Sequence, residues 1–142
     1  YTAAIKANKP DASVTTKPCP LFVPLVEEGL IEGAVTRLVA EGYLAPLRDA
    51  GIDTLVLGCT HYPLLKSVIA EVMGKSVRLI DSAEAVAEEV KALLDAGDMM
   101  NTPGKDGSHG FFVTDSPERF VEVGRRFYGT RLESALLVRL EA

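Results

Sequence analysis

A tetrapeptide near the middle of the chain places a thiol, a hydroxyl and an imidazole next to one another. The sequence Gly-Cys-Thr-His at residues 58–61 follows an apolar strand predicted for residues 53–57 and precedes a helix that begins at or near Pro63. In open α/β sheets, ligands bind beyond the carboxyl ends of the strands, and the tetrapeptide occupies that position. The pattern therefore predicts a ligand-binding turn that carries reactive side chains.

Each side chain of this turn has a chemical use. The N–H groups and partial positive charge of a helix N-terminus favour the thiolate form of a cysteine, here Cys59. His61 can supply a proton or a positive charge beside that thiol. The Thr60 hydroxyl, together with the same N–H groups, forms a cradle for a substrate carboxylate. We therefore expect the turn to bind an anion and to move a proton.

Two simpler interpretations stay open at this point. A single cysteine at the end of a strand often serves only packing, so Cys59 has a structural alternative. A zinc site built from Cys59, His61, Cys19 and His109 has suitable ligand types, but no pair has a recognised structural-zinc spacing. We therefore expect no metal site, and we expect His109, in a glycine-rich loop, to be solvated.

Composition limits the classes of function. The chain has 142 residues with 15 Lys and Arg against 20 Asp and Glu, a net charge of −5, and its hydrophobic fraction of 47% is that of a folded domain. The acidic balance argues against a nucleic-acid partner. No apolar stretch approaches the roughly 18–20 residues of a membrane span. Two cysteines are too few for a secreted disulfide framework, which favours a cytoplasmic location.

Short β-branched runs alternate with helical stretches, which predicts an α/β fold with a mainly parallel sheet. Apolar stripes at helical spacing predict helices after Pro63, around Val90 and around Val123, and Gly74 and Gly129 are predicted to end two of them. Ser116, just before Pro117, is predicted to cap the last helix. A loop is expected over residues 97–110. The strands are expected at residues 12–16, 53–57, 76–80, 111–114 and 134–140.

Four stretches of the chain resemble segments of the bacterial glutamate racemases of the aspartate/glutamate racemase family. The octapeptide Gly-Cys-Thr-His-Tyr-Pro-Leu-Leu at residues 58–65 resembles their second-cysteine motif. Segments at residues 19–27, 43–47 and 79–82 also agree, in the same order and at the same separations. Aspartate and hydantoin racemases typically keep the glycine and cysteine but not the histidine, so His61 favours glutamate.

The resemblance implies inversion at the α-carbon of glutamate without a cofactor, which supplies D-glutamate for peptidoglycan. Two cysteines act on opposite faces of the substrate: one removes the α-proton as a thiolate, and the other returns a proton as a thiol. By this resemblance Cys59 is one of the pair, Thr60 holds the substrate, and His61 assists proton handling. Glu27 matches a carboxylate that the family holds near the site.

The first half of the family's pattern is absent from this chain, including its Asp-Ser-Gly turn, its Pro-Tyr-Gly turn and the other catalytic cysteine in Cys-Asn-Thr. Cys19 matches a segment that does not supply that thiol, so we expect it to be structural. The chain also opens at Tyr1 without a methionine. We therefore expect these 142 residues to be inactive alone and the full-length parent to racemise glutamate.

The family's domain order predicts how the chain is divided. Residues 1–80 are expected to form most of a second α/β domain, incomplete at its N-terminus, and residues 81–142 the returning C-terminal part of a first domain. Each domain is expected to be a three-layer sandwich around a parallel sheet. Because neither is complete, we expect low stability or association, for example as a homodimer. The alternatives are a racemase of aspartate or another acidic amino acid, and a non-catalytic α/β binding module.

Overall fold

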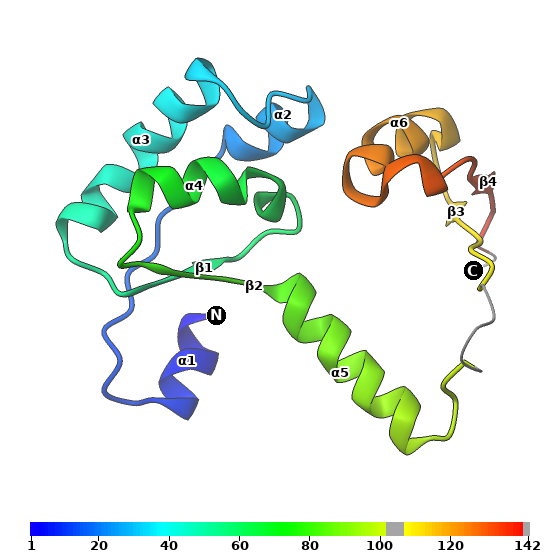
Figure 1. Cartoon of the computed structure of the whole chain (residues 1–142), viewed down its shortest axis with the longest axis horizontal. Helices are drawn as coiled ribbons and strands as arrows, with labels where there is room; N and C mark the ends of the chain where they lie inside the picture. Colours follow the sequence, from blue (N-terminus) through cyan, green and yellow to red (C-terminus); the bar gives the residue numbers. More distant parts are fainter. Residues whose placement is uncertain (102–106, 141–142) are drawn as a thin grey trace. The chain divides into compact units, whose positions relative to one another are not determined.

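The computed structural model describes residues 1–101 and 107–140 of the chain (Figure 1). Two compact units are present, Tyr1–Glu89 and Val90–Ala142. The α/β class is confirmed, since helices alternate with strands and both strand pairs are parallel. The expected domain boundary at residue 80 stays a prediction.

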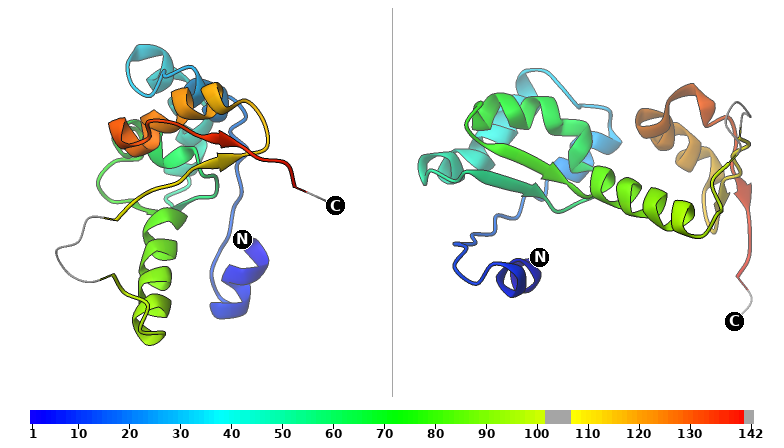
Figure 2. Two further views of the ribbon diagram at one scale, coloured as in Figure 1. Left: turned by 90° about the vertical axis from the view of Figure 1, so that its right-hand side faces the viewer. Right: turned by 60° about the horizontal axis from the view of Figure 1, so that its bottom comes forward.

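The first unit is built around two parallel strands that pair along their whole length. Strand β1 (Thr54–Leu57) runs beside β2 (Arg78–Asp81), with Leu57 opposite Asp81 at the carboxyl end. Helices α3 and α4 lie over one face of these strands (Figures 1 and 2). The helices of the unit are α1 (Thr2–Asn8), α2 (Phe22–Glu27), α3 (Ala34–Asp49), the 3₁₀ helix η1 (Tyr62–Leu65), α4 (Lys66–Met73) and the first half of α5 (Ser82–Ala96).

The core of this unit lies between the helices and the covered face of the strands. Phe22, Val26 and Ile69 are almost fully buried, and the ring of Phe22 is packed edge-on by Tyr43 and Tyr62. Aromatic pairs of this geometry add to the stability that area burial provides. Cys19, Leu25, Ala40, Leu44, Leu47, Leu57, Leu65, Val68, Val72 and Met73 complete the buried cluster.

The alternation of side chains along β1 separates a covered face from an open one. Leu55 and Leu57 pack against the helices, whereas Val56 points to the other face and is 36% exposed. Ile80 on β2 is 37% exposed on that face. The continuous apolar run of β1 predicts that helices cover both faces of the sheet. Within the described residues, α3 and α4 cover one face of the β1–β2 pair.

One predicted strand is wrong. Residues 12–16 have no strand assignment and lie in a segment without regular structure that leads from α1 to α2. The β-branched residues Val14, Thr15 and Thr16 favour extended backbone, but a strand also needs a hydrogen-bonded neighbour. The described sheet to which such a strand would add contains only β1 and β2.

The second unit pairs two very short strands beside one helix. Strands β3 (Phe112–Val113) and β4 (Leu136–Leu137) are parallel and shorter than predicted, and all but Val113 are exposed. Helix α6 (Pro117–Tyr128) begins with its predicted proline and ends at Gly129, which has φ of 73°, before the 3₁₀ helix η2 (Gly129–Arg131). Each of these strands pairs with one other strand, so few neighbouring contacts stabilise a longer strand.

Ser116 occupies the predicted N-cap position of α6 but does not cap the helix. Its backbone is left-handed, with φ of 42°, and its hydroxyl donates to Asp115 instead of accepting a helix N–H. The left-handed backbone differs from the extended conformation that N-cap side chains use, so the predicted cap is wrong.

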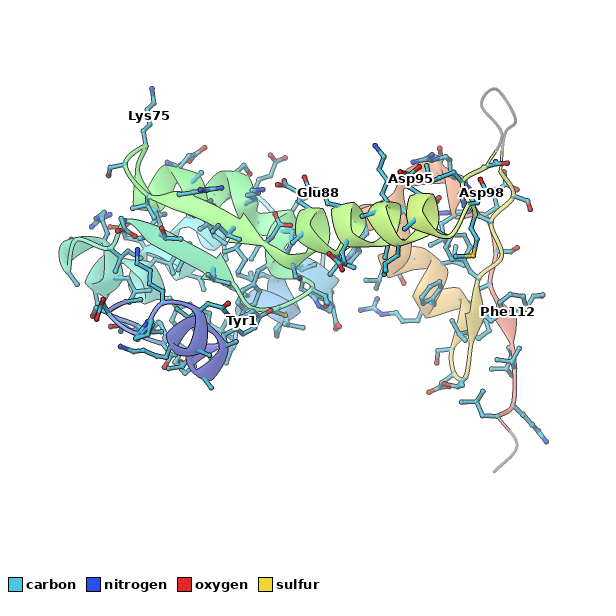
Figure 3. All side chains as sticks on the ribbon, turned by 90° about the horizontal axis from the view of Figure 1, so that it is seen from below. Tyr1, Lys75, Glu88, Asp95, Asp98 and Phe112 are labelled. Atoms are coloured by element: carbon cyan, nitrogen blue, oxygen red, sulfur yellow. The ribbon has the colours of Figure 1, made fainter. Side chains whose placement is uncertain are left out.

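Helices α5 and α6 contain no buried residue. Their predicted apolar stripes are present but exposed, with Val86, Leu93 and Phe127 among the exposed residues. Figure 3 shows charged side chains such as Glu88 and Asp95 on α5, and Lys75 extending away from the turn between α4 and β2. No helix within residues 1–101 and 107–140 is both long and apolar enough to cross a membrane.

Candidate functional site

The tetrapeptide lies in the tight connection that follows strand β1. β1 ends at the buried Leu57, and η1 begins at Tyr62 with Pro63 in its first turn. The helix start predicted at Pro63 is therefore confirmed, but its first turn is a 3₁₀ helix and α4 begins only at Lys66. The position beyond the carboxyl end of a parallel strand is where α/β proteins bind ligands.

Two backbone N–H groups of this turn are used internally. The N–H of Tyr62 donates to the carbonyl of Cys59 at 3.3 Å, and that of Leu64 donates to the carbonyl of His61 at 3.1 Å. These bonds close the 3₁₀ turn. The predicted anion cradle of helix N–H groups is therefore smaller than expected, because these two donors already have protein partners.

Gly58 allows close packing at the entrance of the turn. A Cβ atom added at Gly58 would lie 3.2 Å from Cε2 of Tyr1, which is tighter than most side-chain contacts. The ring of Tyr1 thus lies against the backbone directly before Cys59. Gly58 permits that approach because it has no side chain.

His61 connects two of the other predicted site residues. Its Nδ1 lies 3.3 Å from the Thr60 hydroxyl, and its Nε2 lies 3.6 Å from Oε1 of Glu27, the last residue of α2. The side chain of His61 is 25% exposed and that of Glu27 is 45% exposed. The fold thus brings Thr60, His61 and Glu27 into one row, although Glu27 lies 34 positions before His61 in the chain.

This row favours one arrangement of protons on the imidazole. A carboxylate near Nε2 favours a proton on that nitrogen, which leaves Nδ1 to accept the Thr60 hydroxyl. The row therefore holds an imidazole between a hydroxyl and a carboxylate in the same turn as Cys59.

The two thiols have different environments. Cys59 is a partly buried free thiol in the turn, whereas Cys19 is a buried free thiol with 5% of its surface exposed. Burial raises the pKa of the Cys19 thiol, and a weaker opposing effect comes from Lys17. Its Sγ lies 3.6 Å from the carbonyl oxygen of Lys17. A neutral thiol inside the core has the environment expected of a packing residue.

Tyr62 directly follows His61, and no pattern in the sequence predicts a role for it. Its hydroxyl donates to the carbonyl of Cys19 at 3.2 Å, and its ring packs edge-on against Phe22 with centroids 5.2 Å apart. Burial raises the pKa of Tyr62, and the nearby Cys19 and Cys59 raise it further. The position of Tyr62 directly after His61 is the one sequence feature that could indicate a role. Its hydrogen-bond partner, the Cys19 carbonyl, lies 43 residues away in the chain.

His109 lies in the second unit and has a defined contact. The hydroxyl of Tyr128 is 3.1 Å from each ring nitrogen of His109, and the two rings meet edge to face. The His109 side chain is exposed, in agreement with the predicted solvated histidine, and its contact with Tyr128 was not predicted. Within residues 1–101 and 107–140, no three His, Cys, Asp or Glu side chains are grouped so as to hold a metal ion.

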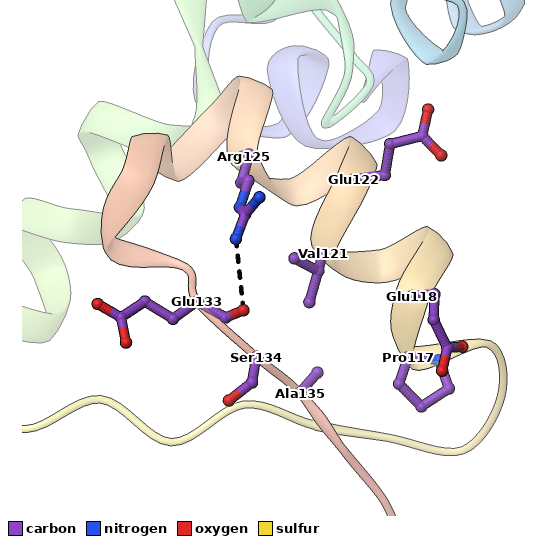
Figure 4. Close-up of a pocket in the computed structure, with 8 residues that line it drawn as sticks. All are labelled: Pro117, Glu118, Val121, Glu122, Arg125, Glu133, Ser134 and Ala135. Atoms are coloured by element: carbon purple, nitrogen blue, oxygen red, sulfur yellow. Dashed lines mark hydrogen bonds between the residues drawn. The ribbon is translucent and has the colours of Figure 1, made fainter.

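A shallow pocket of about 440 Å³ lies in the second unit and contains none of the predicted site residues (Figure 4). The guanidinium of Arg125 donates to the backbone carbonyls of Leu132 and Glu133, so it is occupied with holding the chain after α6. The pocket is lined by Pro117, Glu118, Val121, Glu122, Arg125, Glu133, Ser134 and Ala135.

Comparison with known proteins identifies relatives of the whole chain. The family model for Asp/Glu/Hydantoin racemase matches residues 12–90, which include the complete tetrapeptide and Glu27. Glutamate racemase from Geobacter metallireducens is 50% identical over 142 residues, covering 100% of this chain and 53% of that protein. Glutamate racemase from Chlorobaculum tepidum is 48% identical over 138 residues, covering 97% and 51%.

Solved structures agree with these sequence matches. The crystal structure of glutamate racemase from Francisella tularensis in complex with D-glutamate matches with a TM-score of 0.86 and 36% identity, over 99% of this chain and 53% of that one. The structure of glutamate racemase from Thermus thermophilus matches with a TM-score of 0.79 and 41% identity. The chain spans about half the length of the curated relatives it matches.

Proposed function

Because the chain belongs to the Asp/Glu/Hydantoin racemase family, we propose that it supplies one face of the active site of a glutamate racemase. Cys59 is the acid and base on that face. Thr60 holds the substrate, and His61, supported by Glu27, assists proton handling at Cys59. The opposite thiol comes from a Cys-Asn-Thr segment that these 142 residues do not contain.

The proposed reaction exchanges one proton at each face of the α-carbon. The Cys59 thiolate takes the α-proton, so the S–H bond forms as the Cα–H bond breaks and the electron pair stays on the α-carbon. The opposite thiol then gives its proton to the other face of that carbon and becomes a thiolate. From the other enantiomer the two cysteines exchange roles, and the reaction requires no cofactor.

The observation that carries the proposal is the row of Thr60, His61 and Glu27 beside a partly buried cysteine, at the carboxyl end of a parallel strand. An imidazole between a hydroxyl and a carboxylate is suited to proton storage. On this proposal His61 is the proton store for Cys59, which precedes Thr60 in the chain.

Glutamate is the substrate that the relatives favour. The Geobacter metallireducens and Chlorobaculum tepidum proteins are named glutamate racemase, and the Francisella tularensis structure contains D-glutamate. His61 also favours glutamate over aspartate and hydantoin, whose racemases typically lack this histidine. By the same family pattern the product is D-glutamate for peptidoglycan, made in the cytoplasm.

The proposal includes the division of the chain between two domains. Residues 1–80 form most of the domain that carries the Cys59 face, and residues 81–142 return to complete the other domain. Each is a layered parallel-sheet domain.

The test uses a protein in which this chain is joined to a half that carries the Cys-Asn-Thr cysteine. Circular dichroism should show that it racemises L- and D-glutamate, whereas Cys59→Ser should lower kcat for racemisation by at least about 10²-fold. In deuterated water, Cys59→Ser should still exchange the α-proton of one enantiomer much faster than that of the other. An unimpaired Cys59→Ser protein would contradict the proposal. Slow, unselective alkylation of Cys59 would favour a non-catalytic binding module.

A further inference from the structure

Helix α2 carries Glu27 toward the catalytic turn, but the helix is only six residues long. Helices this short are not stable by themselves, so tertiary contacts must hold α2 in place. The Glu27 and His61 side chains are too exposed for their ion pair to do this, because solvent screens such pairs and makes them weak. The position of Glu27 must therefore depend on other contacts of α2.

Leu25 and Val26 of α2 are buried in the core, and a further set of contacts is made at the start of the helix by Tyr62, the residue that follows His61. The buried Phe22 begins the helix, and the ring of Tyr62 packs edge-on against it with an interplanar angle of 86°. The carbonyl of Cys19 accepts two hydrogen bonds, one from the Tyr62 hydroxyl at 3.2 Å and one from the N–H of Phe22 at 3.1 Å. The Tyr62 ring thus packs against the first residue of α2, and its hydroxyl binds the carbonyl that also accepts the N–H of that residue.

We propose that Tyr62 is a positioning residue, whose ring and hydroxyl hold helix α2 in register with the catalytic turn so that Glu27 stays within reach of His61. This inference rests on the proposed function. Tyr62 lies next to His61 in the chain, so one residue connects the turn to the start of the helix that ends in Glu27. Burial keeps the pKa of Tyr62 above its usual value, so the hydroxyl remains a donor.

The closest matched control is Tyr43 on α3. Its ring packs edge-on against the same Phe22 at 5.5 Å, but it lies in another helix, away from the catalytic turn in sequence. Tyr43→Phe and Tyr62→Phe each remove one phenol hydroxyl from the same aromatic cluster. Only Tyr62→Phe also removes the hydrogen bond to the Cys19 carbonyl.

The experiment measures racemisation by the whole protein, with glutamate deuterated at the α-carbon, from both enantiomers. Tyr62→Phe should lower kcat/KM by roughly five- to tenfold, the effect of one lost hydrogen bond. The primary isotope effect should rise only for the enantiomer whose α-proton Cys59 removes, because the opposite thiol removes the α-proton of the other enantiomer. Loss of folded protein would leave both isotope effects unchanged, since an isotope effect does not depend on the amount of active enzyme.

A double variant shows whether Tyr62 acts through Glu27. If it does, Tyr62→Phe should lower kcat/KM little further in a Glu27→Gln protein. The inference would be overturned if the loss of kcat/KM in the double variant equalled the product of the losses in the two single variants. It would also be overturned if Tyr62→Phe had the same isotope effects as Tyr43→Phe. Either result would leave the racemase proposal intact. An unmodified protein that exchanges no α-proton would instead overturn the proposed function.

Discussion

At the residue scale, the site depends on which groups surround one imidazole. His61 contacts the Thr60 hydroxyl through Nδ1 and faces the Glu27 carboxylate through Nε2. Two oxygen groups on opposite sides of the ring restrain its orientation and favour one tautomer, as second partners of functional histidines generally do. Cys59 is a partly buried free thiol in the same turn, whereas Cys19 is buried in the core and its thiol has a raised pKa.

Replacing His61 by asparagine should test this role. Asparagine can still form a hydrogen bond with Thr60, but its amide cannot take up and release a proton near neutral pH. The value of kcat should therefore fall by about 10²-fold. The unfolding midpoint should change little, because the ring is partly exposed and lies outside the buried cluster. Steady-state kinetics and thermal unfolding check the two expectations. A His61→Asn protein with normal kcat would remove His61 from the proposed mechanism.

At the scale of elements, one buried carboxylate joins β2, α4 and α5. Oδ1 of Asp81 accepts the N–H groups of Ala83 and Glu84 in the first turn of α5, which satisfies two otherwise unpaired helix donors. Its Oδ2 accepts a hydrogen bond from Lys66, the first residue of α4, at 2.8 Å. Because Asp81 pairs with Leu57 at the end of β1, this junction also borders the catalytic turn.

Acid should weaken this junction. The Lys66 ammonium, followed by the N–H of Glu84, holds the pKa of Asp81 below its usual value. A carboxyl whose pKa is lower in the folded state stabilises the fold above its unfolded pKa of about 3.9, and this stability is lost as pH falls through the folded pKa. Asp81→Asn should therefore lower the free energy of unfolding by about 1–3 kcal/mol at pH 7 and by less near pH 3.

Urea unfolding of the unmodified protein and of Asp81→Asn, each at pH 7 and pH 3, measures how much the substitution lowers the free energy of unfolding. Glu84→Gln is the control, because Glu84 also meets Lys66 but its side chain is 77% exposed, so stability should change little. An Asp81→Asn effect that is the same at both pH values would show that charge at Asp81 does not matter.

At the scale of the whole molecule, much apolar surface lies exposed on α5, α6 and the short strands. Val86, Leu93, Leu136 and Leu137 are each at least 58% exposed. Patches of this kind are usually interfaces, and relatives of the chain are about twice its length. The 142 residues alone should therefore self-associate or unfold easily, and should not racemise glutamate.

Sedimentation across a range of concentrations, together with the circular dichroism assay, tests these expectations for the isolated chain. The average mass should rise with concentration, and the optical activity of L-glutamate should stay constant. A monomer that unfolds cooperatively at micromolar concentration would contradict the first expectation. Racemisation by these 142 residues would contradict the second.

Features that depend on neighbouring residues could be predicted from the amino-acid sequence. The apolar run of β1, the proline at the start of η1 and the glycines at the ends of α4 and α6 were predicted because backbone preference is local. The remaining features depend on contacts between residues that are distant in the chain. Residues 12–16 form no strand because no neighbour pairs with them. His61 meets Glu27, and Tyr62 meets the Cys19 carbonyl, only because core packing places α2 against η1, an effect of contacts between residues far apart in the chain.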